Sequence, residues 1–147
     1  MTQERPVRHP IKLRSLADLP ALVDATVGMS ARVQSWTPEN VIAFDGVFGG
    51  IRSLLAVTIA RHAPNVLVLV PQAVDADIVS GDCIALGASE SVALPLSATD
   101  GTPDSIRDAD YAERLQVLQR LRTRSGHDPT SLVVTAYVGT NCIAAPT

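Results

Sequence analysis

The chain has 147 residues, of which 46% are hydrophobic and 18% charged, and its formal net charge is −3. This length suits one domain with a sizeable core, and the acidic balance argues against a nucleic-acid-binding surface spread over the whole domain. No apolar run approaches the ~20 residues needed to span a bilayer, and no signal-peptide pattern opens the chain. We therefore expect a cytoplasmic protein without membrane contact.

The first residues differ in composition from the rest of the chain. They carry two prolines and four basic side chains, namely Arg5, Arg8, Lys12 and Arg14. Terminal charge runs are usually solvated, so we expect an irregular leader over residues 1–14. Residues 15–147 are expected to form a single α/β domain.

The first expected helix covers residues 16–27. Ser15 can cap it, and Gly28 offers a stop. Its apolar residues recur at three- and four-residue steps: Leu16, Leu19, Leu22, Val23 and Val27. This spacing predicts an amphipathic helix. Residues 30–40 are expected to form a connection into the central part of the domain.

The remaining elements alternate between short apolar runs and helical patterns. An apolar run over residues 41–44 ends in a glycine-rich turn that leads into a predicted helix. The further expected elements are helix 50–62, strand 66–70, helix 73–86, strand 92–96, loop 97–107, a helix from Asp108 that Gly126 closes, and strand 131–136. The last helix has a predicted apolar face made of Ala112, Leu115, Leu118 and Leu121.

This alternation predicts an α/β fold with a parallel sheet of about four strands and helices on both faces. The run over residues 66–70 is aliphatic without alternation. Such a pattern is typical of a central strand that is covered on both faces. With its glycine-rich turn between an apolar run and a helix, the expected fold is similar to a degenerate phosphate-loop nucleotide-binding fold.

The glycine-rich turn is the first candidate site. Aligned to the phosphate-loop pattern G-x-x-x-x-G-K-[ST], it places Gly46 at the first glycine and Ser53 at the hydroxyl. Ile51 replaces the second glycine and resists positive φ, while Arg52 replaces the lysine. Lys12 is the only lysine in the chain.

Two interpretations of this loop stay open. Gly49, Gly50, Arg52 and Ser53 could form a weak anion site at a helix N-terminus. Alternatively, the glycines serve a tight turn only, which the lost lysine and the intruding isoleucine favour. No expected strand ends in the acidic residue that would hold magnesium, and no G-x-S-x-G motif occurs. We expect no catalytic residue in this chain.

Cysteine and histidine spacing gives no further site. Cys83 and Cys142 are far apart without C-x-x-C spacing, so we expect free thiols. The histidines, at positions 9, 62 and 127, are scattered. We expect neither a metal nor a cofactor.

Three segments in this order resemble a known family. They are F-D-G-V-F-G-G-I-R-S-L-L (44–55), Y-A-E-R-L-Q-V-L-Q-R-L (111–121) and S-L-V-V-T-A (131–136). The chain is similar to the N-terminal, UvrB-like module of the bacterial transcription-repair coupling factor, which carries a lysine-free relic of the nucleotide loop of UvrB. The similarity covers roughly residues 16–147. The segment L-P-L-S-A-T-D (94–100) matches the family's corresponding segment only loosely.

The resemblance implies a role rather than a reaction. The family's parent protein is an ATP-driven DNA translocase that displaces stalled RNA polymerase and recruits the repair protein UvrA, and its UvrB-like module does not hydrolyse ATP. The chain would then be a piece of a longer multidomain protein, and UvrA, RNA polymerase and DNA would be partners through that parent.

Two other functions remain possible from the residues alone. One is a small nucleotide-binding enzyme that uses Arg52 as its phosphate contact. The other is an interaction adaptor unrelated to repair, which an exposed apolar patch would indicate.

Overall fold

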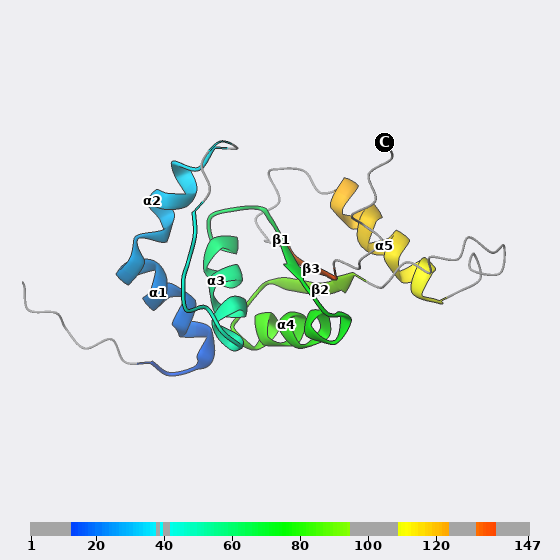
Figure 1. Ribbon diagram of the computed structural model, residues 1–147, viewed down its shortest axis with the longest axis horizontal. Helices are drawn as coiled ribbons and strands as arrows, with labels where there is room; N and C mark the ends of the chain where they lie inside the picture. The colour runs from blue at the N-terminus through cyan, green and yellow to red at the C-terminus, as the bar shows by residue number, and fades with distance from the viewer. Residues whose placement is uncertain (1–12, 38, 40–41, 95–108, 124–131, 138–147) are drawn as a thin grey trace, which may run out of the picture.

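The computed structural model describes residues 13–37, 39, 42–94, 109–123 and 132–137. Helices and strands alternate along most of this chain (Figure 1). In order, the elements are the 3-10 turn η1 (Leu16–Asp18), α1 (Leu19–Val27), α2 (Met29–Gln34), α3 (Gly50–Ala60), β1 (Asn65–Val70), α4 (Ala73–Ala85), β2 (Glu90–Leu94), α5 (Ala109–Thr123) and β3 (Leu132–Tyr137).

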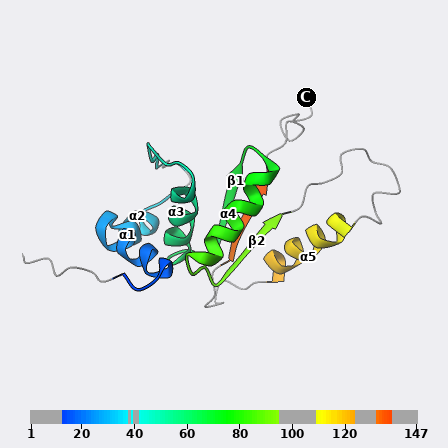
Figure 2. The same cartoon turned by 90° about the horizontal axis from the view of Figure 1, so that it is seen from below.

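The sheet has three parallel strands in the order β1-β3-β2. The last strand in the chain therefore lies in the middle, where Val134 is in register with Leu67 of β1 and Val92 of β2. Helix α4 connects β1 to β2 and helix α5 connects β2 to β3, and the two helices lie on opposite sides of the sheet (Figures 1 and 2). The predicted α/β class with a parallel sheet is confirmed.

The predicted strand over residues 41–44 is wrong within the described chain. Ile42, Ala43 and Phe44 belong to no strand, and the described sheet has three strands rather than about four. A short apolar run becomes a strand only where a neighbouring strand takes up its main-chain hydrogen bonds. The described sheet ends at β1, and residues 42–44 do not pair with this edge strand.

The main core lies between one face of the sheet and the helices α3 and α4. Side chains from α3 (Ala56, Val57, Ala60) meet side chains from α4 and the sheet. The buried members from α4, its C-terminal end and the strands are Val70, Ala76, Val79, Cys83, Leu86 and Val133. Many of these side chains are small, which allows α3 and α4 to approach each other and the sheet closely.

The opposite face of the sheet is only partly covered. Val117 of α5 packs on Val134, with Leu121 and the β2 residues Val92 and Leu94 around them. On β1 the same face stays open, because Leu67 is 61% exposed and Leu69 is 60% exposed. The prediction of a central strand covered on both faces is therefore wrong for β1 within the described chain, where β1 is an edge strand of the sheet.

Of the predicted apolar face of α5, Leu121 packs as expected, but the other three residues do not. The residues that pack are Val117 and Leu121, spaced by four. Leu115 and Leu118 are 48% and 43% exposed, and Ala112 is exposed as well. At about 100° per residue, Leu115, Leu118, Leu121 and Val117 form one broad stripe. Contact with β2 and β3 buries only the part of this stripe that Val117 and Leu121 make.

The N-terminal helices pack against α3 at the other end of the molecule (Figure 1). Gly28 ends α1 in the left-handed conformation (φ 67°), as predicted, but α2 follows at once where a connection was expected. Helix α2 has six residues, and its inward side chains, Met29 and Val33, give too short a pattern to be recognised.

None of the described helices has the length and apolar character that crossing a membrane requires. The leader over residues 1–14 was predicted to be irregular, and residues 1–12 of it lie outside the described chain.

Candidate functional site

The glycine-rich loop lies at the N-terminal end of α3, as the sequence pattern placed it. Asp45 and Gly46 form a turn, Gly49 caps the helix and Gly50 is its first residue. Gly46 has φ 72° and Gly49 has φ 52°, which are values that favour glycine over any residue with a Cβ atom. These two glycines therefore serve the backbone geometry of the turn.

Two main-chain amides at the end of this loop are already used inside the protein. The N–H of Ile51 donates to the carbonyl of Phe48 (3.1 Å), and the N–H of Arg52 donates to the carbonyl of Gly49 (3.2 Å). In a phosphate loop, successive amides instead point at the phosphate oxygens. Here the first turn of α3 closes on itself.

Ser53 faces the protein interior rather than a ligand. Its side chain is fully buried, and its hydroxyl donates to Oδ2 of Asp82 on α4 (3.3 Å). A Cβ atom placed on Gly50 would lie 3.8 Å from the same carboxylate oxygen. The Asp82 carboxylate thus lies beside the first turn of α3, where a negative charge interacts favourably with the helix dipole. A phosphate at this place would meet that charge.

The remaining loop side chains bring little polar chemistry. Phe48 is 77% exposed and Ile51 is 48% exposed, so apolar groups flank the loop on its solvent side. Arg52 is half-buried, and its Nε atom is buried without a hydrogen-bond partner in the described chain. The predicted residues Gly49, Gly50, Arg52 and Ser53 do come together, but as one helical turn.

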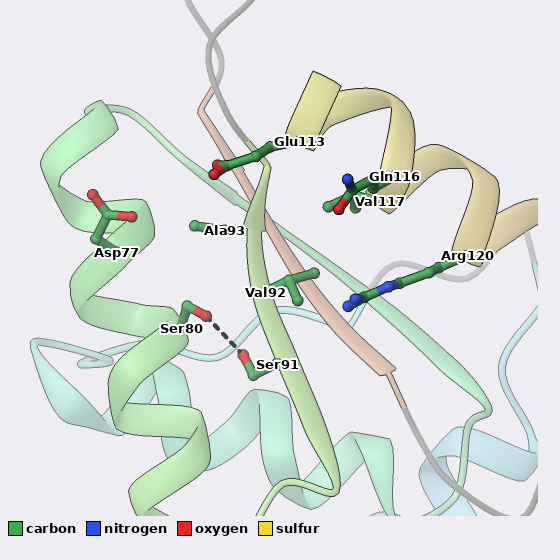
Figure 3. A pocket seen from close by; sticks show the side chains of 9 residues that line it. All are labelled: Asp77, Ser80, Ser91, Val92, Ala93, Glu113, Gln116, Val117 and Arg120. Atoms are coloured by element: carbon green, nitrogen blue, oxygen red, sulfur yellow. Dashed lines mark hydrogen bonds between the residues drawn. The ribbon is translucent and has the colours of Figure 1, made fainter. Parts of the chain in front are cut away.

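A second candidate site lies along the outer edge of β2, between α4 and α5 (Figure 3). It is a cavity of about 370 Å³. Its lining residues are Asp77 and Ser80 from α4, Ser91, Val92 and Ala93 from β2, and Glu113, Gln116, Val117 and Arg120 from α5. Sequence reasoning missed this site, because it combines three segments that are distant in the chain.

The polar groups of this cavity are arranged in two parts. At one part, the Ser80 and Ser91 hydroxyls lie 3.2 Å apart, and Arg120 Nη1 donates to Oε1 of Glu90 (3.1 Å). At the other, Asp77 and Glu113 flank Ala93 from opposite helices (Figure 3). Neither of these two carboxylates has a hydrogen-bond or ion-pair partner among the described residues.

A third hollow is apolar and lies between α2, α3 and β1. Its volume is about 490 Å³. Its lining residues carry no charge: Met29, Val33, Trp36, Ile42, Phe44, Ile59, Ala63, Asn65, Val66 and Leu67. Ile42 and Phe44, which were expected to belong to a strand before the loop, thus line this groove together with residues of β1.

Titratable groups outside the loop and the two cavities lie in the core or contact a neighbouring helix. Cys83 is a free, fully buried thiol, and burial raises its pKa to about 11, so it is an unreactive group of the core. His62 Nε2 on α3's C-terminal side lies 2.7 Å from Oδ2 of Asp24 on α1. The described residues contain no cluster of His, Cys, Asp and Glu that could hold a metal ion. His9, His127 and Cys142 lie outside the described chain.

No family model, no curated protein and no solved structure matches this chain.

Proposed function

We propose that this chain is a non-catalytic scaffold module of a transcription-coupled DNA repair factor, which supports recruitment of the excision-repair protein UvrA. The observation that carries the non-catalytic part is the contact between Ser53 and Asp82. It buries the one hydroxyl of the phosphate-loop pattern and sets a carboxylate beside the helix N-terminus, where a nucleotide would need a free positive field.

The place in DNA repair rests on the sequence resemblance. Of its three segments, the second lies in α5 and the third largely in β3, and Val117 packs on Val134 between them. Two segments that are apart in the chain thus meet in one small core, which favours a common structural role for them. RNA polymerase and DNA would be contacted by other parts of the parent protein.

One observation favours the alternative of a small nucleotide-binding enzyme. The buried Nε of Arg52 has no hydrogen-bond partner in the described chain, and a guanidinium is a good phosphate ligand. Against this, the amides of Ile51 and Arg52 are bonded within the loop. The alternative predicts that Arg52→Ala abolishes nucleotide binding.

Strand-specific repair after ultraviolet damage tests the proposal in cells. Deleting the coding segment for residues 15–147 should remove the faster repair of transcribed strands and leave repair of the other strand unchanged. Arg52→Ala in the chromosomal gene should preserve the strand bias, because the loop binds no nucleotide. A bias that survives the deletion would contradict the repair role, and a bias lost in Arg52→Ala would favour the enzyme.

A further inference from the structure

The edge of β2 has main-chain groups that no described strand pairs. β2 is the last strand in the order β1-β3-β2, so β3 takes up the hydrogen bonds of one side only. An edge strand presents unpaired N–H and C=O groups to any extended chain beside it. Addition of a peptide strand to such an edge is a recurring mode of protein recognition.

The described surroundings of this edge leave it accessible at the cavity-lining residues Ser91, Val92 and Ala93. The cavity of about 370 Å³ runs along it, and the β2 side chains on the α4 side, Ser91 and Ala93, are small. Helices α4 and α5 stand on either side of the strand rather than across its edge (Figure 3). An extended chain can therefore approach the backbone of β2 between the two helices.

The charges beside the edge of β2 favour a guest peptide with a positively charged side chain. Asp77 and Glu113 are exposed and flank Ala93 from both helices. The one cation of the lining, Arg120, is engaged by Glu90 at the other end of the strand. A guest side chain near Ala93 thus meets two carboxylates, which attract a cation and repel an anion.

We propose that the edge of β2 binds an extended protein segment as an additional strand, with a lysine or arginine side chain between Asp77 and Glu113. This proposal assigns a partner-binding surface to the scaffold. It rests on the part of the proposed function by which the chain acts through protein contacts. It does not depend on a role in DNA repair. Main-chain pairing supplies the affinity, and the two carboxylates set the register of the guest.

Synthetic peptides titrated into the full, ¹⁵N-labelled chain test this by NMR. The probe is an acetylated and amidated peptide of alternating threonine and valine with one central lysine. Two matched peptides carry glutamate at that place, or lysine with methylated amide nitrogens on the pairing edge. We expect the lysine peptide to shift the amide signals of β2 and of the facing sides of α4 and α5. The glutamate and methylated peptides should leave them unchanged.

A charge-neutral double variant of the protein isolates the two carboxylates. Asp77→Asn/Glu113→Gln should weaken binding of the lysine peptide about five- to tenfold, as two exposed charge contacts would. Glu39→Gln/Asp45→Asn removes the same charge at exposed positions away from the cavity and should leave the Kd within about twofold. Both variants retain the fold, because all four side chains are exposed.

Several results would overturn peptide binding at this edge. They are no response to the lysine peptide at millimolar concentration, equal binding of the glutamate or methylated peptide, shifts centred elsewhere, or no effect of the Asp77/Glu113 variant. Concentration-dependent shifts of β2 without peptide would show that a second copy occupies the edge. Strand-specific repair is measured separately, so failure of the peptide site leaves the repair role standing, and the reverse also holds.

Discussion

Polar groups on the two sides of α4 have opposite environments. On the side toward α3, Asp82 accepts the buried hydroxyl of Ser53, and the thiol of Cys83 is fully buried. On the side toward β2 and α5, Asp77 is exposed beside a cavity and a strand edge that no described strand pairs. One side is filled by the protein's own groups, and the other is the side where we propose that a peptide strand binds.

The comparison indicates at which of the two places a ligand or partner is expected to bind. A helix N-terminus next to glycines suggests an anion site, but at α3 the amides of Ile51 and Arg52 are bonded to the loop, and the hydroxyl of Ser53 is bonded to Asp82. The edge of β2 contains no recognisable motif, yet its main-chain groups and two carboxylates have no counterpart in the described chain. Unsatisfied polar groups, rather than motif resemblance, mark the open surface.

The largest expected difference between the two sides is in stability. Val79 on α4 is 2% exposed, whereas the adjacent Ile78 is 56% exposed. Val79→Ala removes buried methyl groups from the core between α4 and the sheet and should lower the free energy of unfolding by about 2 kcal/mol. Ile78→Ala should change it by less than about 0.5 kcal/mol. Urea unfolding of both variants measures this, and equal losses would show that α4 does not have a closed and an open side.

A smaller difference is expected for the two aspartates of α4. Asp82→Ala leaves the buried hydroxyl of Ser53 without its acceptor and should cost about 1 kcal/mol of unfolding free energy. Asp77→Ala removes an exposed side chain and should be close to neutral. Asp82→Ala with Ser53→Ala should recover part of the loss, because the orphaned hydroxyl is gone. A neutral Asp82→Ala would show that the contact with Ser53 does not hold α3 against α4.

The contact between Asp24 of α1 and His62 after α3 should be sensitive to acid. Partial burial of the Asp24 carboxyl alone would raise its pKa, but hydrogen bonds from His62 (2.7 Å) and from the Ser30 N–H (3.0 Å) outweigh burial and hold that pKa below its ordinary value of 3.8. The folded protein therefore binds this proton more weakly than the unfolded chain. The stability from Asp24 is complete above the unfolded pKa and is lost as the pH falls through the folded pKa.

Urea midpoints measured from neutral pH down to the acid limit should separate this contribution from those of other carboxyl groups. We expect Asp24→Asn to be less stable than the unmodified chain at neutral pH, with the difference shrinking as the pH falls below the ordinary carboxyl range. A difference that stays constant with pH would mean that the contact with His62 and Ser30 does not depend on the charge of Asp24.

Local sequence patterns predicted the elements well where the signal was local. Helix α3, helix α4 and the stop at Gly28 follow from glycines and apolar density, and they form as expected. The fold class follows from the alternation of strands and helices. The edge position of β2 also agrees with the proline that follows it at position 95.

The predictions that failed concern features that depend on contacts between distant segments of the chain. Whether residues 42–44 form a strand depends on a neighbour, and which stripe of α5 is buried depends on β2 and β3. The pairing of Ser53 with Asp82, 29 positions away, has no signature in the sequence. The same holds for the cavity beside β2, because three separate elements supply its walls.

The most direct test of a closed α3 N-terminus is calorimetric titration of the full chain with ATP and magnesium, beside the variants Asp82→Asn and Ile51→Gly/Arg52→Lys. We predict no binding heat from the unmodified chain. Heat gained by the Ile51/Arg52 variant would show that the loop keeps the shape of a nucleotide site without its chemistry. Micromolar, magnesium-dependent binding by the unmodified chain, abolished by Arg52→Ala, would contradict the scaffold role and establish Arg52 as a phosphate ligand.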